Sequence, residues 1–158
     1  MPRTLDLAES PFPIPERFHA VRYNGARYPG TGGGLELGAN CQKFAYEFIR
    51  HFGYEIADFR SSGLWEDTAY TRALGDSEEL KALDLVLFNR NREAWGAHVG
   101  VSLGGGLVLH LSKGVGGPAI WHLDRFAGCL EYACLIGAKA PVRLRGHTLG
   151  VLAATEKE

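Results

Sequence analysis

The sequence predicts an α+β domain in which helices come first and an antiparallel β-sheet follows. The first observation is one amphipathic helix pattern that begins after Asn40 and ends at Gly53. The second is a change of period in the second half of the chain, where short β-rich segments are separated by Gly, Asn or Pro. Helices followed by a run of strands are typical of an α+β domain.

The helix pattern after Asn40 has one apolar stripe with spacings of three and four residues. The stripe consists of Phe44, Ala45, Phe48, Ile49 and Phe52. Asn40 is a good N-cap, because its side chain can accept hydrogen bonds from the free N–H groups of the first turn. Gly53 provides a C-terminal stop. Two further patterns predict helices over residues 64–74 and 77–82.

Five segments of the second half are predicted to be strands, and we expect them to form an antiparallel sheet packed on the first helix. They cover residues 83–90, 97–104, 106–112, 119–123 and 130–138.

Length and composition indicate one domain with its own core, since the chain has 158 residues, of which 46% are hydrophobic and 22% charged. Four of the seven prolines lie in residues 1–20, which we interpret as an extended arm. Residues 21–144 are then the single domain, and residues 145–158 are a loose tail.

The composition disfavours several classes of function. A formal net charge of -1 gives no basic excess for nucleic acid or an anionic membrane. No apolar run approaches the roughly 20 residues of a membrane span. The N-terminus lacks an apolar signal region, so a cytoplasmic protein is expected, with non-classical export left open. Three cysteines without CxxC spacing favour a reducing compartment over a disulfide framework.

Cys41 stands in the first turn of the predicted helix, directly after Asn40. The helix dipole and the unpaired N–H groups favour a negative charge there, and such sites can lower the pKa of a thiol. The backbone N–H of Cys41 could also donate to an oxyanion. The alternative is a buried, inert cysteine, which is the more common state of a free thiol. Cys129 and Cys134 fit that alternative.

His98 and His110 flank a predicted hairpin with the sequence HVGVSLGGGLVLH. If residues 103–105 form a three-residue loop, His98 lies directly opposite His110, and both side chains share one face of the sheet. A two-residue loop would place them on opposite faces. In the first case His98 can act as the general base for Cys41, and His110 can orient the His98 ring.

Two other readings of this region were weighed. His98, His110 and His122 are each 12 residues apart, and three histidines can hold a zinc ion. No HExxH-type motif is present, so no metal is expected. The glycine-rich turn lacks a Walker-type GK[ST] sequence, so no phosphate site and no cofactor is expected.

These residues together resemble the NlpC-type cysteine peptidases, a papain-like family that cuts bacterial cell-wall peptides. The similarity runs from about Tyr28 to Ala138. Its parts are a Tyr-containing, glycine-rich loop, a cysteine at a helix start, an LDLVLF strand, a His-Val-Gly strand and a second histidine after a glycine turn. In this chain they read ARYPGTGGG, NCQKF, LDLVLF, HVGVSLGGG and LVLH, and LIGAK is similar to the closing strand.

The resemblance implies a papain-like NlpC-type fold, with Cys41 as the nucleophile, His98 as the base and His110 as the orienting residue. Tyr28 corresponds to the loop tyrosine that places the substrate or the oxyanion. Asn40 replaces the family's aspartate, which belongs with recognition of the substrate's amine. We further expect Trp65 to line one side of the cleft.

We therefore expect a cysteine hydrolase that cleaves an amide or peptide bond, in a peptide or a small amide-containing substrate such as a cell-wall-derived peptide. The NCQKF stretch is also similar to the Asn-Cys-Glu-His-Phe stretch of lecithin:retinol acyltransferase-like proteins, a permuted branch of the same superfamily. Acyl transfer or amidase action on a small molecule or lipid is thus the first alternative. The second is a non-catalytic binding module of the same fold.

Overall fold

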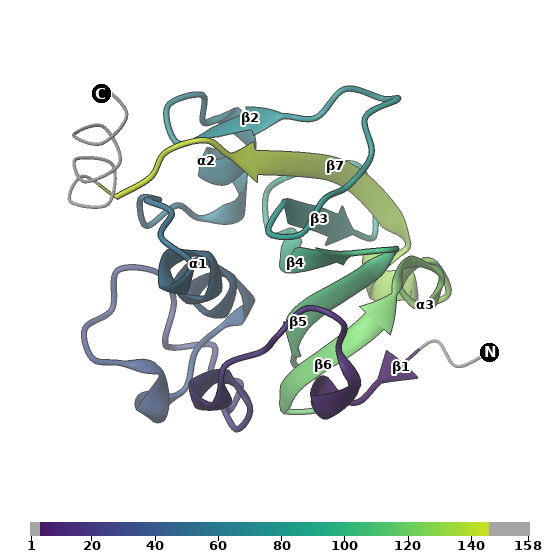
Figure 1. The fold of residues 1–158 in the computed structure, drawn as a ribbon. Helices are drawn as coiled ribbons and strands as arrows, with labels where there is room; N and C mark the ends of the chain where they lie inside the picture. Colours follow the sequence, from purple (N-terminus) through teal and green to yellow (C-terminus); the bar gives the residue numbers. More distant parts are fainter. Residues whose placement is uncertain (1–3, 146–158) are drawn as a thin grey trace.

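The computed structural model describes residues 4–145, and its centre is one antiparallel sheet of seven strands (Figure 1). The strand order is β1-β6-β5-β4-β3-β7-β2. The strands are β1 (Thr4–Leu5), β2 (Thr71–Ala73), β3 (Leu85–Asn89), β4 (His98–Gly104), β5 (Leu107–Ser112), β6 (Gly117–His122) and β7 (Cys134–Pro141). The main helix, α1 (Cys41–His51), precedes the five central strands in the chain and packs on β4 and β5, which confirms the predicted α+β class.

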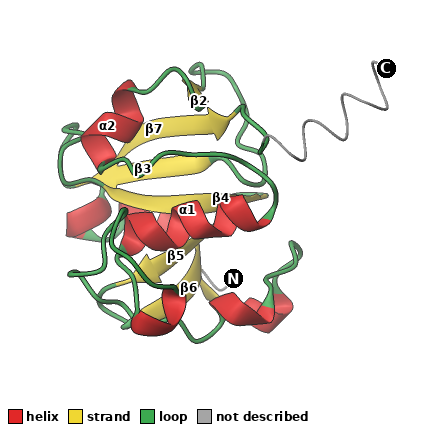
Figure 2. Cartoon of the chain, turned by 90° about the vertical axis from the view of Figure 1, so that its left-hand side faces the viewer, coloured by secondary structure: helices red, strands yellow, loops and turns green. Residues whose placement is uncertain are grey.

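Helix α1 lies across one face of the sheet, as Figure 2 shows. The predicted apolar stripe packs there against side chains of β4 and β5 that point to the same face; four of its residues are buried, and Phe52 is partly buried. Asn40 caps the helix, since its Oδ1 accepts a hydrogen bond from the Lys43 N–H at 2.9 Å. Gly53 follows the helix in the left-handed region, with φ of 100°. Both predicted ends of the helix are therefore confirmed.

The opposite face of the sheet carries a second, smaller core, in which side chains of β3, β5 and β6 pack against α3 (Leu123–Ala127). Phe126 of α3 stacks on Phe88 of β3, with ring centroids 4.1 Å apart. Short 3-10 helices complete the fold: η1 (Leu7–Glu9), η2 (Glu16–Phe18), η3 (Leu35–Leu37) and η4 (Leu130–Tyr132). The central strands are thus covered on both faces.

From residue 4 onward, the segment predicted as an extended arm is attached to the core. Strand β1 pairs with β6, and the Phe18 side chain is fully buried. The Phe18 ring meets the rings of Phe44 and Phe48 edge-on, at 5.8 and 4.9 Å. At the other end Leu144 forms a bridge with Tyr54. The predicted tail lies outside the described residues from position 146.

The helix predicted over residues 64–74 is wrong: α2 covers Ser61–Glu66, and residues 71–73 form β2. The physical reason is Asp67. Its carboxylate accepts hydrogen bonds from the backbone N–H groups of residues 69–71, so the chain turns and enters the sheet instead of continuing the helix. Local side-chain acceptors of this kind compete with helical hydrogen bonds.

The short helix predicted over residues 77–82 is absent from the described chain. The Glu78 carboxylate there accepts from the Gly75 N–H at 2.9 Å and pairs with Arg72, which holds the segment in turns.

All five predicted central strands exist, with shifted ends. The segment 130–138 divides into η4 and β7, and β6 begins at Gly117. Within residues 4–145 no helix is both long and apolar enough to cross a membrane.

Candidate active site

The hairpin between β4 and β5 places the two histidines on one face, but through a different loop from the predicted one. The predicted three-residue loop is wrong: Gly104 pairs with Leu107, so only Gly105 and Gly106 form the loop. Both loop residues have positive φ, 63° and 84°, as a type I′ turn requires. This loop alone would put the imidazoles on opposite faces.

A β-bulge at Leu103 restores the shared face. The register shifts between Ser102 and Gly104, after which Ser102 pairs with Val108. The extra residue changes the parity of the ladder, so the two histidines return to the same side. In this register His110 lies across from Gly100, where an added Cβ would meet the His110 Cβ at 3.4 Å. The predicted shared face is confirmed, and the predicted direct opposition is wrong.

The two imidazoles form a hydrogen bond, with His98 Nε2 2.8 Å from His110 Nδ1. His110 is fully buried and His98 nearly so. Three aromatic rings surround His110, and one of them, Tyr132, also stacks on His98 at 4.5 Å. The other two rings belong to Trp121 and Phe126. Each imidazole therefore has a fixed orientation, set by its partner and by the rings around the pair.

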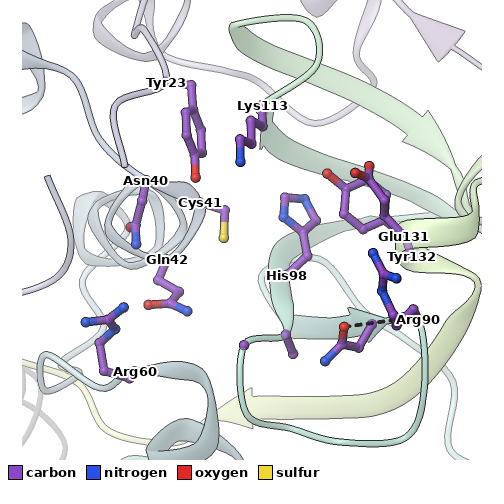
Figure 3. Close-up of a pocket in the computed structure, with 13 residues that line it drawn as sticks. Tyr23, Asn40, Cys41, Gln42, Arg60, Arg90, His98, Lys113, Glu131 and Tyr132 are labelled. Carbon is purple, nitrogen blue, oxygen red and sulfur yellow. Dashed lines mark hydrogen bonds between the residues drawn. The ribbon is translucent and has the colours of Figure 1, made fainter. Parts of the chain in front are cut away.

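Cys41 is the first residue of α1, and its side chain is buried where α1 meets β4. Backbone N–H groups of Val99, of Gln42 and of Cys41 itself lie near the sulfur and lower the pKa of the thiol. Val99 directly follows His98 in β4, so the thiol lies against the strand beside the base candidate. Figure 3 shows the Cys41 sulfur and the His98 ring facing each other across one cleft.

The cleft has a volume of about 410 Å³ and opens onto the Cys41–His98 pair. Its walls come from the segment before α1, the start of α1, the N-cap of α2, the end of β3 with the β3–β4 loop, the start of β4, the β5–β6 loop and η4. The lining residues are Tyr23, Asn40, Cys41, Gln42, Arg60, Asn89, Arg90, Gly96, Ala97, His98, Lys113, Glu131 and Tyr132.

Burial is the largest influence on the pKa values of Cys41, His98 and His110. It raises the pKa of the Cys41 thiol, although the neighbouring N–H groups and the Arg60 charge work in the other direction. The N–H groups of the helix start therefore lower this pKa as expected, but the net shift is upward, because loss of hydration outweighs the helix terminus.

The two histidines are affected by the same cause. Burial lowers the pKa of His98 to about 4. Burial, followed by the neighbouring His98 and Arg125, holds the pKa of His110 well below its usual range. At neutral pH the site accordingly holds a neutral thiol and two neutral imidazoles.

The remaining predicted site residues lie at different distances from the cleft. Asn40 lines it and caps α1. Tyr28 is outside the lining, and its ring supports the Arg60 guanidinium from 5.0 Å. Trp65 is not brought to this cleft: it packs over Gly137, and its ring lies 5.9 Å from Lys139 Nζ.

Tyr23, rather than Tyr28, is the tyrosine beside Cys41 (Figure 3). It is held there by a parallel bridge to Ala39, just before the helix cap. The sequence offers two tyrosines in this loop, and only the pairing of Tyr23 with Ala39 decides between them. Gln42 and Tyr132 were also missed as cleft residues; Gln42 directly follows Cys41, which was the available signal.

The third histidine of the zinc alternative lies apart from the pair. His122 is the N-cap of α3, where its Nδ1 accepts from the Asp124 N–H at 3.2 Å. Across residues 4–145, no three His, Cys, Asp or Glu side chains come close enough together to hold a metal ion.

Comparison with known proteins does not assign the chain to a family. No protein-family model matches the sequence, and a search of curated proteins gives no significant match.

Proposed function

We propose that this protein is a cysteine hydrolase of the NlpC type, with a papain-like fold, that cleaves an amide bond through Cys41, His98 and His110. The observation that carries the proposal is the 2.8 Å bond between His98 Nε2 and His110 Nδ1, in a cleft shared by His98 and Cys41. A nucleophile, a base within the same cleft and a third group that orients the base are the parts of a catalytic triad.

The hydrogen bond between the histidines determines which nitrogen can serve the thiol. Since Nε2 of His98 is bound to His110, only Nδ1 of His98 remains to accept a proton. For Nδ1 to be free of hydrogen, Nε2 must carry the proton and donate it to His110 Nδ1. The mechanism therefore requires the tautomer in which His110 Nδ1 accepts from His98, and in that arrangement His110 stabilises the imidazolium that forms when His98 takes the thiol proton.

The reaction then follows from two neutral partners. His98 Nδ1 removes the Cys41 proton as the sulfur attacks the amide carbonyl carbon, and the resulting oxyanion lies near the free N–H groups of the first turn of α1. The carbon–nitrogen bond breaks, and His98 returns the proton to the leaving amine. Water, deprotonated by the same nitrogen, attacks the thioester and releases the carboxylate, and Cys41 regains its proton.

Several features fit the resemblance, and one departs from it. Tyr23 takes the place beside the thiol that the family gives to its loop tyrosine. Asn40 keeps the capping role but brings no carboxylate, so the amine recognition of the family has no counterpart at this position. The proposal therefore covers the bond type and the machinery, with a cell-wall-derived peptide as one substrate among acyl amides.

A second candidate is acyl transfer, which uses the same thioester and replaces water by an amine or hydroxyl acceptor. A third is a binding module without catalysis, and one observation favours it: burial raises the pKa of the Cys41 thiol. A protonated thiol without an active base would be inert.

The first test is the rate at which iodoacetamide alkylates Cys41 at neutral pH, resolved by site with mass spectrometry. Cys134, a half-buried thiol remote from the histidines in sequence, is the internal control. In the wild type Cys41 should react faster than Cys134, and His98→Asn should slow Cys41 on the order of 10²-fold, the lower end of general-base assistance. Cys41 that reacts no faster than Cys134, and is unaffected by His98→Asn, would support the binding module.

A further inference from the structure

The outer edge of β7 has an unpaired stretch next to β2. Strand β7 has eight residues, but β2 pairs only with the three from Lys139 to Pro141. The Leu74 N–H then donates to the Ala138 carbonyl oxygen at 3.0 Å, and this is the last backbone hydrogen bond on that side within residues 4–145. In the described chain, residues 134–137 therefore have β3 on one side and no strand on the other (Figure 1).

This open stretch of β7 lacks the usual protection of an exposed edge. Natural edges are blunted by charged side chains, by proline, by bulges or by a covering segment. Residues 134–138 read CLIGA, with neither a charge nor a proline, and the Leu135 side chain is 44% exposed. A β-bulge is present, since Ile136 is skipped in the register with β3, but a bulge does not cover the edge. The backbone of this stretch is thus open to a further strand.

A groove runs along the open stretch. Its volume is about 500 Å³, and it shares no lining residue with the cleft of the candidate active site. Residues 135–138 form one wall, and the Trp65 ring, which lies over Gly137, forms another. Leu80, from the β2–β3 connection, lines the groove as well. Trp65 and Leu80 pack against the cores on opposite faces of the sheet, so the groove between them continues the plane of the sheet.

The two ends of the groove carry opposite charges. At the start of β7 the groove is lined by Arg92, whose Nη1 lies 3.8 Å from the Cys134 sulfur. At the other end it is lined by Asp76, just after β2. Neither side chain has an oppositely charged partner within ion-pair distance among residues 4–145. The groove therefore offers one unpaired charge to each end of an elongated ligand.

The direction of β2 fixes how these charges relate to an added strand. Strand β2 is antiparallel to β7, and its direction continues along the open stretch toward Cys134. A peptide that follows β2 in this direction has its amino end near Asp76 and its carboxyl end near Arg92. Both charges then face the opposite charge of a peptide terminus. A parallel peptide would meet a like charge at each end.

We propose that this groove binds an extended peptide, which adds to the sheet as an antiparallel strand and places its C-terminal carboxylate at Arg92. In this binding mode main-chain hydrogen bonds give affinity, and contacts with alternate side chains give specificity. The open stretch is about 14 Å long, at about 3.4 Å per residue, so the site takes about four residues at the end of the peptide. The site is separate from the cleft and does not depend on the proposed hydrolase.

The probe is a library of random short peptides displayed with free C-termini and selected for binding to the full chain. A selected peptide is then synthesised with a C-terminal carboxylate and with a C-terminal amide, and both affinities are measured by fluorescence anisotropy. The amide should bind about two- to fivefold more weakly than the acid, as for an exposed charge pair. Arg92→Gln should weaken the acid by the same factor and leave the amide unchanged.

Arg90→Gln is the matched control. It removes the same charge from the same loop, but Arg90 lines the cleft instead of the groove. It should leave the affinity of both peptides unchanged. Leu135→Lys adds a charge to the exposed edge and should weaken both peptides, because an edge lysine opposes strand addition. If Leu135→Lys fails to fold, the comparison of Arg92→Gln with Arg90→Gln still decides the point.

N-methylated peptides test the strand pairing itself. Successive N–H groups of a strand point to opposite sides, so only alternate amides of the peptide can bond to β7. Methylating an amide of that set should weaken binding about fivefold or more, and methylating an amide of the other set should change it little. In NMR spectra the shifts that the peptide causes should centre on residues 134–138 and on the Trp65 indole.

Three results would overturn the proposal. The first is a selection that yields no peptide, or only peptides that are insensitive to Arg92→Gln and to amidation. The second is an equal loss in Arg90→Gln with shifts centred on Cys41 and His98, which would place the peptide in the cleft. The third is self-association in sedimentation without peptide that Leu135→Lys abolishes, which would assign the edge to a second copy of the chain.

Discussion

Acid should destabilise this protein before its carboxylates are protonated, because His98 is folded in its neutral form. Burial lowers the pKa of His98 to about 4, against about 6.5 in an unfolded chain. Between these values the unfolded state binds more protons, so the contribution of His98 is full above about pH 6.5 and is lost as the pH falls toward 4. The whole contribution is about 3 kcal/mol, at about 1.4 kcal/mol for each pKa unit. About 2 kcal/mol of it is lost between pH 7 and pH 5.

The assay is urea unfolding followed by tryptophan fluorescence, repeated at intervals between about pH 7 and pH 5, a range above the usual carboxylate pKa values. The free energy of unfolding should fall by at least about 2 kcal/mol over that range. His98→Asn should lose the part due to His98 and keep the part due to His110, whose pKa is lowered in the same direction. His51→Gln, which replaces an exposed histidine outside the cleft, is the matched control.

A wild-type free energy of unfolding that is constant within about 0.5 kcal/mol from pH 7 to pH 5 would refute this reasoning. So would a loss of slope in His51→Gln equal to that in His98→Asn. The wild-type measurement alone decides the point if His98→Asn fails to fold.

Two further substitutions, at Gly100 and at Asn40, test the packing and the helix cap that position the site residues. Gly100→Ala should lose about 1–3 kcal/mol in urea unfolding, because a Cβ there would lie 2.6 Å from Val108 Cγ1. Gly114→Ala, whose nearest atom would be 3.9 Å away, should change little, and an equal loss in both would contradict the steric account. Asn40→Ala should lose about 1 kcal/mol with the cap to Lys43, while Asn40→Asp should retain it; equal losses would show that the cap is not the cause.

The parts of the fold that the sequence predicted are those with local signals. The stripe of α1, its Asn40 cap and its Gly53 stop all lie within one short segment, and the central strands carry their own apolar patterns. Strands β1 and β2 have only two and three residues, and each exists because a longer neighbour offers an open edge. Such edges arise only after the sheet has assembled, so they have no signal in the sequence.

The candidate site shows the same division. Cys41, His98 and His110 were found because a helix start and a hairpin are local features. The shared face of the histidines was predicted correctly from an incorrect loop, since the bulge at Leu103 offset the shorter turn. The direction of the Cys41 pKa could not be predicted, because it depends on how deeply α1 buries the thiol against the strand that follows His98.

The bulge at Leu103 makes the hairpin sensitive to changes in chain length. If one residue were deleted and the strands closed again around a two-residue loop with the bulge kept, one histidine would move to the face covered by α1. Deletion of the bulged residue Leu103 itself would instead leave both imidazoles on one face. Removing or adding two residues would leave both imidazoles on the same face. In a diverging lineage that keeps the bulge, this hairpin should therefore accept length changes in even steps, while odd steps separate the two histidines even when every site residue is retained.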